Sequence, residues 1–113
     1  GADDSTVKKW GEGIQGETNG TVQHTFQDLG FVPTEAVIND DLRQPLPANA
    51  DVYYQVEDAD GNSQTIQRSN LDTTVDLTGF TSTSVSTTAF IERNDTTVTS
   101  PQLDAWALYL RGA

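Results

Sequence analysis

The stretch that decides the fold is Asp51-Val-Tyr-Tyr-Gln-Val-Glu57, followed by Asp58-Ala-Asp-Gly-Asn62 and Ser63-Gln-Thr-Ile-Gln-Arg68. Side chains of a strand alternate between its two faces, so Val52, Tyr54 and Val56 are expected on one buried face. Asp60-Gly61 supplies residues that adopt the positive φ angles of a tight hairpin turn. The stretch therefore predicts a β-hairpin.

Short β-type runs separated by turn residues continue on both sides of this hairpin, without a helical stripe of useful length. Asn39–Ala50 contains two prolines and is expected to be a loop that crosses between sheets, because proline lacks a backbone donor. We expect an all-β, two-sheet antiparallel β-sandwich of about eight strands, jelly-roll or immunoglobulin-like, forming one domain over residues 1–113. The expected strands are Thr6–Trp10, Thr21–Asp28, Glu35–Ile38, Asp51–Glu57, Ser63–Arg68, Thr73–Leu77, Ser84–Glu92 and Leu103–Leu110, the last five as a meander.

The composition indicates a particular environment. The chain carries 17 acidic and 6 basic residues among 113, a net charge of −11, and 12 of the acids are Asp. Short carboxylates expose little apolar surface, and in molar salt the Debye length of about 3 Å removes most self-repulsion. We expect a protein of an extreme halophile. Nucleic acid is not an expected partner, because no segment offers a basic stripe, and no apolar run predicts membrane insertion.

Catalytic and cofactor chemistry is not expected. Without cysteine, thiolate metal sites are excluded, and His24 is the one histidine. His24 shares the alternation face of Val22 and Phe26, which favours a structural role at the core edge. We therefore expect no enzyme activity, no catalytic residues, no cofactor and no metal centre. Asp58-x-Asp60-Gly61-Asn62 does not have the spacing of an EF-hand. A weaker calcium or sodium site that involves Asp40, Asp41 or Asp72 is a separate possibility, which the sequence leaves open.

Two surfaces are candidates for binding. Trp106 alternates with Leu108 and Leu110 and is expected in the core, which leaves Trp10 and Tyr53 as aromatic platforms for sugar rings. In Ser84–Glu92, alternation places Ser86, Thr88 and Phe90 outward, where another subunit can cover them. We expect Phe90 to anchor such an assembly interface.

The segments Thr74–Phe80, Val85–Asn94 and Thr99–Trp106 together resemble the closing strands of jelly-roll or lectin-like modules, above all in Ser100-Pro-Gln-Leu-Asp-Ala-Trp106. Such modules occur in secreted proteins and in the tail and surface proteins of viruses. We expect a non-enzymatic structural protein of a halophilic (haloarchaeal) virus particle, such as a tail, baseplate, turret or capsid-decoration component. Its partners would be copies of itself or other structural proteins, and it would be found in the virion.

The alternative is a carbohydrate-binding or adhesion module of a halophilic cell-surface protein, with glycans as partners. We expect the start at Gly1, which has neither a basic nor an apolar leader segment, to favour the virion, whose parts assemble inside the host cell. In the alternative, the module would be cut from a longer cell-surface protein, with Gly1 as a cleavage scar. Two N-glycosylation sequons, Asn19-Gly-Thr21 and Asn94-Asp-Thr96, would favour the extracellular alternative if they carried glycan.

Overall fold

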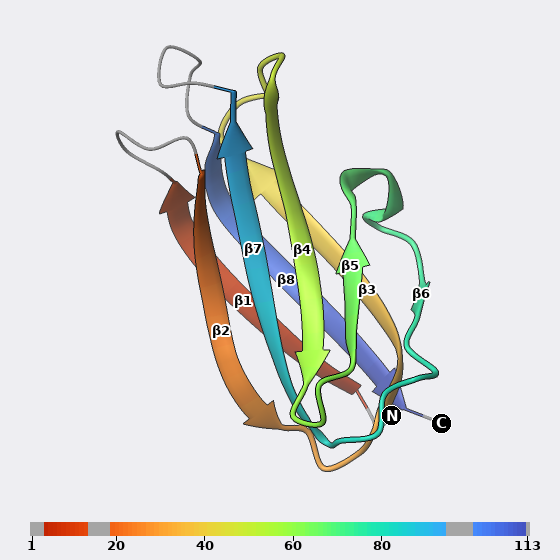
Figure 1. The fold of residues 1–113 in the computed structure, drawn as a ribbon. Helices are drawn as coiled ribbons and strands as arrows, with labels where there is room; N and C mark the ends of the chain where they lie inside the picture. Colours follow the sequence, from red (N-terminus) through yellow and green to blue (C-terminus); the bar gives the residue numbers. More distant parts are fainter. Residues whose placement is uncertain (1–3, 14–18, 95–100, 113) are drawn as a thin grey trace.

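The computed structural model describes residues 4–13, 19–94 and 101–112, of which 4–13 are described by their backbone only. These residues form two antiparallel sheets that face each other (Figure 1). Sheet A has the strand order β1-β8-β3-β6, and sheet B has the order β2-β7-β4-β5. The strands are β1 (Asp4–Gly13), β2 (Asn19–Asp28), β3 (Pro33–Leu42), β4 (Ala50–Asp58), β5 (Ser63–Ile66), β6 (Val75–Asp76), β7 (Ser84–Arg93) and β8 (Gln102–Gly112). A 3-10 helix, η1, spans Arg68–Asn70.

The strand pairing is that of a jelly roll. β1 pairs with β8, β2 with β7, β3 with β6 and β4 with β5, all antiparallel. The chain therefore resembles one long hairpin that is folded over. Two of its strand pairs, β1 with β8 and β3 with β6, lie in sheet A, and the other two lie in sheet B. The contacts of β3 with β8 and of β4 with β7 complete each sheet. This arrangement confirms the predicted sandwich and replaces the expected meander, because consecutive strands alternate between the sheets after β5.

The hairpin of β4 and β5 forms as predicted, with Tyr54 opposite Ile66 and Glu57 opposite Ser63. Its turn differs from the expected one in a single respect. Gly61 has φ +90°, whereas Asp60 is not among the described residues with positive φ. The turn is closed by the Asp58 carboxylate and not by a second residue of left-handed conformation.

The core lies between the inner faces of the two sheets. Val52, Tyr54 and Val56 are fully buried, and Trp106 is 1% exposed, so both predicted inward patterns are confirmed. The remaining members of the buried cluster are Ala36, Ile38, Ile66, Leu77, Phe80, Val85, Ala89, Ile91, Leu103, Leu108 and Leu110.

Two sequence expectations are corrected. β3 runs on to Leu42, so Asn39–Leu42 is strand, and only the part of the predicted loop after it crosses to sheet B. The pairing of β2 shifts between His24 and Gln27, which breaks the alternation that linked His24 to Phe26. As a result Phe26 is 46% exposed. No helix within the described ranges is long and apolar enough to span a membrane.

Candidate functional site

A buried polar cluster joins the sheets at one end of β3. Asp40 points into the sandwich, and its side chain is only 4% exposed. It accepts a hydrogen bond from the Tyr54 hydroxyl at 2.6 Å and two from the Arg68 guanidinium, at 2.7 and 3.2 Å. Burial, and then the bond to the Asp40 carboxylate, raise the pKa of Tyr54 well above its usual range. Both oxygens of the Asp40 carboxylate therefore accept hydrogen bonds from within the protein.

On the opposite, outer face of sheet A, the central strand β8 presents two small residues. Trp106 and Leu108 point inward, so Ala105, Ala107 and Tyr109 point outward. Ala105 pairs with Asp41 and Ala107 pairs with Asn39 on β3. Because alanine side chains rise little above the backbone, they leave a depression beside the longer β3 side chains. Ala107 is only 6% exposed, although it is not part of the core cluster.

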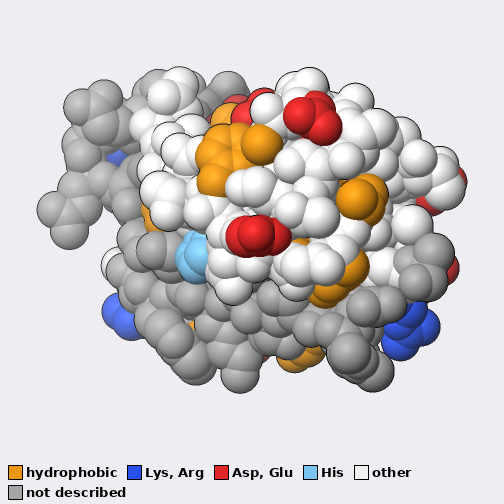
Figure 2. Space-filling view, turned by 90° about the horizontal axis from the view of Figure 1, so that it is seen from below, with side chains coloured by type: hydrophobic (Ala, Val, Ile, Leu, Met, Phe, Trp, Pro, Cys, Tyr) orange, Lys and Arg blue, Asp and Glu red, His pale blue; other side chains and the backbone are white. Residues whose placement is uncertain are grey.

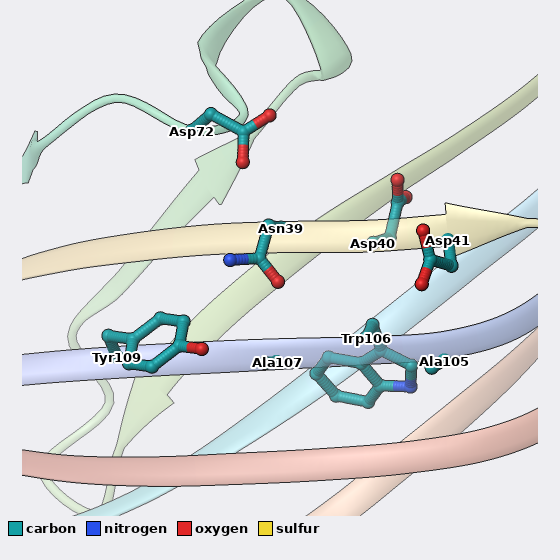
Figure 3. A pocket seen from close by; sticks show the side chains of 8 residues that line it. All are labelled: Asn39, Asp40, Asp41, Asp72, Ala105, Trp106, Ala107 and Tyr109. Atoms are coloured by element: carbon teal, nitrogen blue, oxygen red, sulfur yellow. The ribbon is translucent and has the colours of Figure 1, made fainter.

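This depression is the outer groove, of about 310 Å³, and Figure 3 shows its labelled side chains in two rows, from β3 and from β8, with Asp72 beyond β3. Eight residues line it, including Asp40 and Trp106, whose side chains are buried. The other six are Asn39, Asp41, Asp72, Ala105, Ala107 and Tyr109, and we refer to these as the residues of the outer groove. Tyr109 as a whole residue is 43% exposed. Asp72 has a left-handed backbone (φ 62°), and its N–H donates to the Ile38 carbonyl at 2.8 Å. The loop after η1 is thereby fastened to β3, with the Asp72 side chain exposed.

The three residues at which the sequence left a cation site open, Asp40, Asp41 and Asp72, all line this pocket, but the Asp40 carboxylate is turned to the inner side of the sheet. Asp40 is already bound by Arg68 and Tyr54. Among the residues that the structure describes, no group of three or more His, Asp or Glu side chains is arranged to hold a metal ion.

The hairpin turn Asp58-x-Asp60-Gly61-Asn62, whose sequence is similar to a calcium-binding loop, has a structural role. The Asp58 carboxylate is 1% exposed and accepts hydrogen bonds from the N–H groups of Asp60, Asn62, Thr81 and Ser82 and from the Asn62 side-chain amide, at 2.8–3.1 Å. Burial alone raises the pKa of Asp58, but the hydrogen bonds from Asn62, Thr81 and Ser82 outweigh it and hold the pKa well below its usual range. The turn is thus tied to the loop that precedes β7.

The outer face of sheet B carries Tyr53 and the candidate interface residues of β7. Tyr53 and Phe90 are opposite each other on β4 and β7, and their rings stack with centroids 5.0 Å apart. The Tyr53 hydroxyl donates to Glu92 at 2.8 Å. Thr88 is half-buried, and Ser86 is only 2% exposed within the single chain. The aromatic pair is therefore already packed on itself, and Ser86 offers little surface to a partner.

The exposed hydrophobic side chains of the described residues do not form one continuous patch on the face shown in Figure 2. Within the described ranges, Phe26 and Tyr109 are the large apolar side chains classed as exposed. Figure 2, which views the lower end of the molecule in Figure 1, shows the hydrophobic side chains of that end as separate groups among polar atoms. His24 is half-buried and pairs with the buried Thr87, in agreement with a place at the core edge.

The two aromatic residues predicted as platforms for sugar rings, Trp10 and Tyr53, lie on different sheets. Tyr53 lies on sheet B, whereas Trp10 lies on β1 in sheet A, opposite Ala105, and its side chain is outside the described residues. Sequence reasoning did not single out Tyr109. The signal was present in Leu103–Leu110, because placing Trp106 and Leu108 inward leaves Tyr109 outward.

No family model, curated protein or solved structure matches the chain.

Proposed function

We propose that the protein is a non-enzymatic binding module that holds carbohydrate in the outer groove. The observation that supports this most is the partly exposed Tyr109 ring beside a floor of two alanines, bordered by an amide and two carboxylates. A sugar ring has an apolar C–H face and a rim of hydroxyl groups. The Tyr109 ring suits the apolar face, and the oxygens of Asn39, Asp41 and Asp72 suit the hydroxyls.

The size of the outer groove agrees with a short saccharide. Its volume of about 310 Å³ lies at the lower end of the range of about 300–1,000 Å³ that small-molecule sites occupy. The groove is shallow and open, so it suits a few rings of a longer chain that continues into solvent. Such recognition matches a domain whose inner space is filled by its own side chains.

Among the described residues of the outer groove, the charged side chains are the carboxylates of Asp41 and Asp72, and these favour one kind of ligand. Ionised carboxylates only accept hydrogen bonds, so the ligand must supply donors. Hydroxyl groups and ammonium groups are donors, whereas a carboxylate on the ligand would be repelled by the carboxylates of Asp41 and Asp72. The net charge of −11 acts in the same direction over the whole surface. We therefore expect neutral sugars or amino sugars, and not uronic or sialic acids.

Binding to a panel of immobilised neutral, amino and acidic saccharides in molar KCl tests this proposal. We expect binding to neutral or amino members, with loss in Tyr109→Ala. Asp41→Asn keeps an acceptor oxygen and removes a charge, so it should weaken amino sugars more than neutral ones. Binding confined to acidic saccharides, or binding that Tyr109→Ala leaves unchanged, would contradict the proposal.

A second candidate function follows from the Tyr53–Phe90 stack. A structural protein of a halophilic virus particle, found in the virion, would cover the outer face of sheet B with another subunit, and the stacked rings would supply the apolar centre of that interface. Light scattering in molar KCl distinguishes the two candidates. Assembly predicts oligomers that Phe90→Asp disperses, whereas a strictly monomeric parent that binds a saccharide favours the carbohydrate-binding module.

A further inference from the structure

The sequon Asn19-Gly-Thr21 forms the first three residues of β2. The modification requires the asparagine amide together with the hydroxyl two residues later. In a strand, residues two apart project from the same face, so the side chains of Asn19 and Thr21 are presented side by side. Both are exposed. The local structure therefore offers the two required groups to solvent at once.

The sequon lies on an edge strand of sheet B. β2 is the outermost strand of sheet B, and within that sheet it pairs with β7 alone. Asn19 lies opposite Glu92, and Thr21 lies opposite Phe90. The acceptor is thus at the start of an edge strand, with the side chains of Asn19 and Thr21 both exposed.

The second sequon begins at the same end of the sandwich. Asn94 is exposed, follows β7 directly, and donates its N–H to the Asn49 carbonyl at 2.8 Å. Its Asp95 and Thr96 lie outside the described residues. Asn19 and Asn94 are far apart in the sequence, yet β2 begins where β7 ends, and Figure 1 shows this end opposite the one at which the two chain termini are marked.

We propose that Asn19 carries an N-linked glycan. The donor is an oligosaccharide linked to a lipid phosphate. The side-chain amide nitrogen of Asn19 bonds to the anomeric carbon, the bond between that carbon and the phosphate oxygen breaks, and the lipid phosphate leaves with the electron pair while the amide loses one proton to solvent. The modification requires the chain to be exposed outside the cytoplasm.

This glycan would stand on the same face as the Tyr53–Phe90 stack, because Thr21 and Phe90 are paired and Asn19 shares their face. It would therefore hinder a second subunit on the outer face of sheet B and leave the outer groove, on the other sheet, open. The inference does not depend on the proposed carbohydrate binding, since the two concern opposite faces of the sandwich.

Peptide mass mapping of the protein produced in its native host tests the proposal. Trypsin cuts after lysine and arginine, so Asn19 falls in the peptide of residues 10–43 and Asn94 in that of residues 94–111. We expect peptide 10–43 to carry added saccharide mass, with sugar fragment ions on collision. Thr21→Ser should keep the modification, and Thr21→Val should abolish it. Melting curves check that these exposed substitutions leave the fold intact.

Asn19→Gln separates N-linked from O-linked glycan. It should return peptide 10–43 to its sequence mass if the proposal holds. Saccharide mass that persists in Asn19→Gln, or a native peptide 10–43 found only at its sequence mass, would overturn it.

Discussion

The Tyr54 hydroxyl donates a hydrogen bond of 2.6 Å to the Asp40 carboxylate, from β4 in sheet B to β3 in sheet A. Arg68 binds the same carboxylate through both of its terminal nitrogens. A charge this deep is tolerated because it is paired and hydrogen-bonded. The two sheets are therefore fastened by one polar cluster at the inner side of β3, directly behind the outer groove.

Replacing Arg68 with Met should destabilise the fold strongly, because it leaves a buried carboxylate without its counter-ion. We expect a loss of about 3–5 kcal/mol in the free energy of unfolding. Urea denaturation in molar KCl measures it. The matched control is Arg43→Met, which breaks the ion pair with Asp104 whose side chains are 58% and 40% exposed. That variant should lose about 0–1 kcal/mol. Equal losses in both variants would show that the Asp40 cluster does not join the sheets energetically.

Trp106→Ala should cost about 3–5 kcal/mol, the usual loss for a large buried aromatic side chain. Trp106→Phe should cost distinctly less, because the indole N–H has no hydrogen-bond partner among the described residues and no bond is lost with it. Thermal melting of both variants measures the difference. A Trp106→Ala variant that melts like the parent but loses ligand would move Trp106 from the core to the binding site.

Acid should unfold the protein through Asp58. Its pKa is lower in the folded chain than in the unfolded chain, so its stabilisation is complete above the unfolded value of about 3.9 and is lost as pH falls towards the folded value. Asp58→Asn cannot accept the same five donors and should be less stable at pH 7. The gap in melting temperature between the parent and Asp58→Asn should narrow below about pH 4. A gap that stays constant from pH 7 to pH 2 would contradict the assignment.

Stability should rise with salt concentration. With a net charge of −11, the carboxylates repel one another at low ionic strength. Salt screens this repulsion, because the Debye length falls from about 10 Å at 0.1 M to about 3 Å at 1 M. We expect the melting temperature to increase between these KCl concentrations. An unchanged melting temperature would contradict adaptation to a halophilic environment.

The sequence predicted most of the fold because the information was local. The alternation in Asp51–Glu57 and Leu103–Leu110 and the Asp-Gly turn identified the strands and their inward faces. The pairing of β1 with β8 and of β2 with β7 joins residues from opposite ends of the chain, and no periodicity reports such partners. The choice between jelly-roll and immunoglobulin-like order therefore required the structure.

The candidate site was less accessible to sequence reasoning. The two prolines of Asn39–Ala50 predicted a loop that included Asp40, whereas the structure places Asp40 in β3. Its partner Arg68 is far away in the sequence, in η1, and only the fold shows that the charge is compensated. The outer groove likewise combines β3, β8 and the loop that carries Asp72, three segments that no local pattern links.

Saccharide binding in the outer groove is tested most directly by isothermal titration in molar KCl, which compares variants of two exposed aromatic residues. The titrant is a neutral or amino saccharide retained by the parent protein. Tyr109 and Phe26 are 43% and 46% exposed, so removing either ring takes away a similar amount of apolar surface, but only Tyr109 lines the outer groove. We expect Tyr109→Ala to weaken binding at least tenfold, a loss of about 1.4 kcal/mol, and Phe26→Ala to leave the affinity unchanged. Equal affinity in parent and Tyr109→Ala, or no saccharide retained by the parent, would contradict saccharide binding in the outer groove.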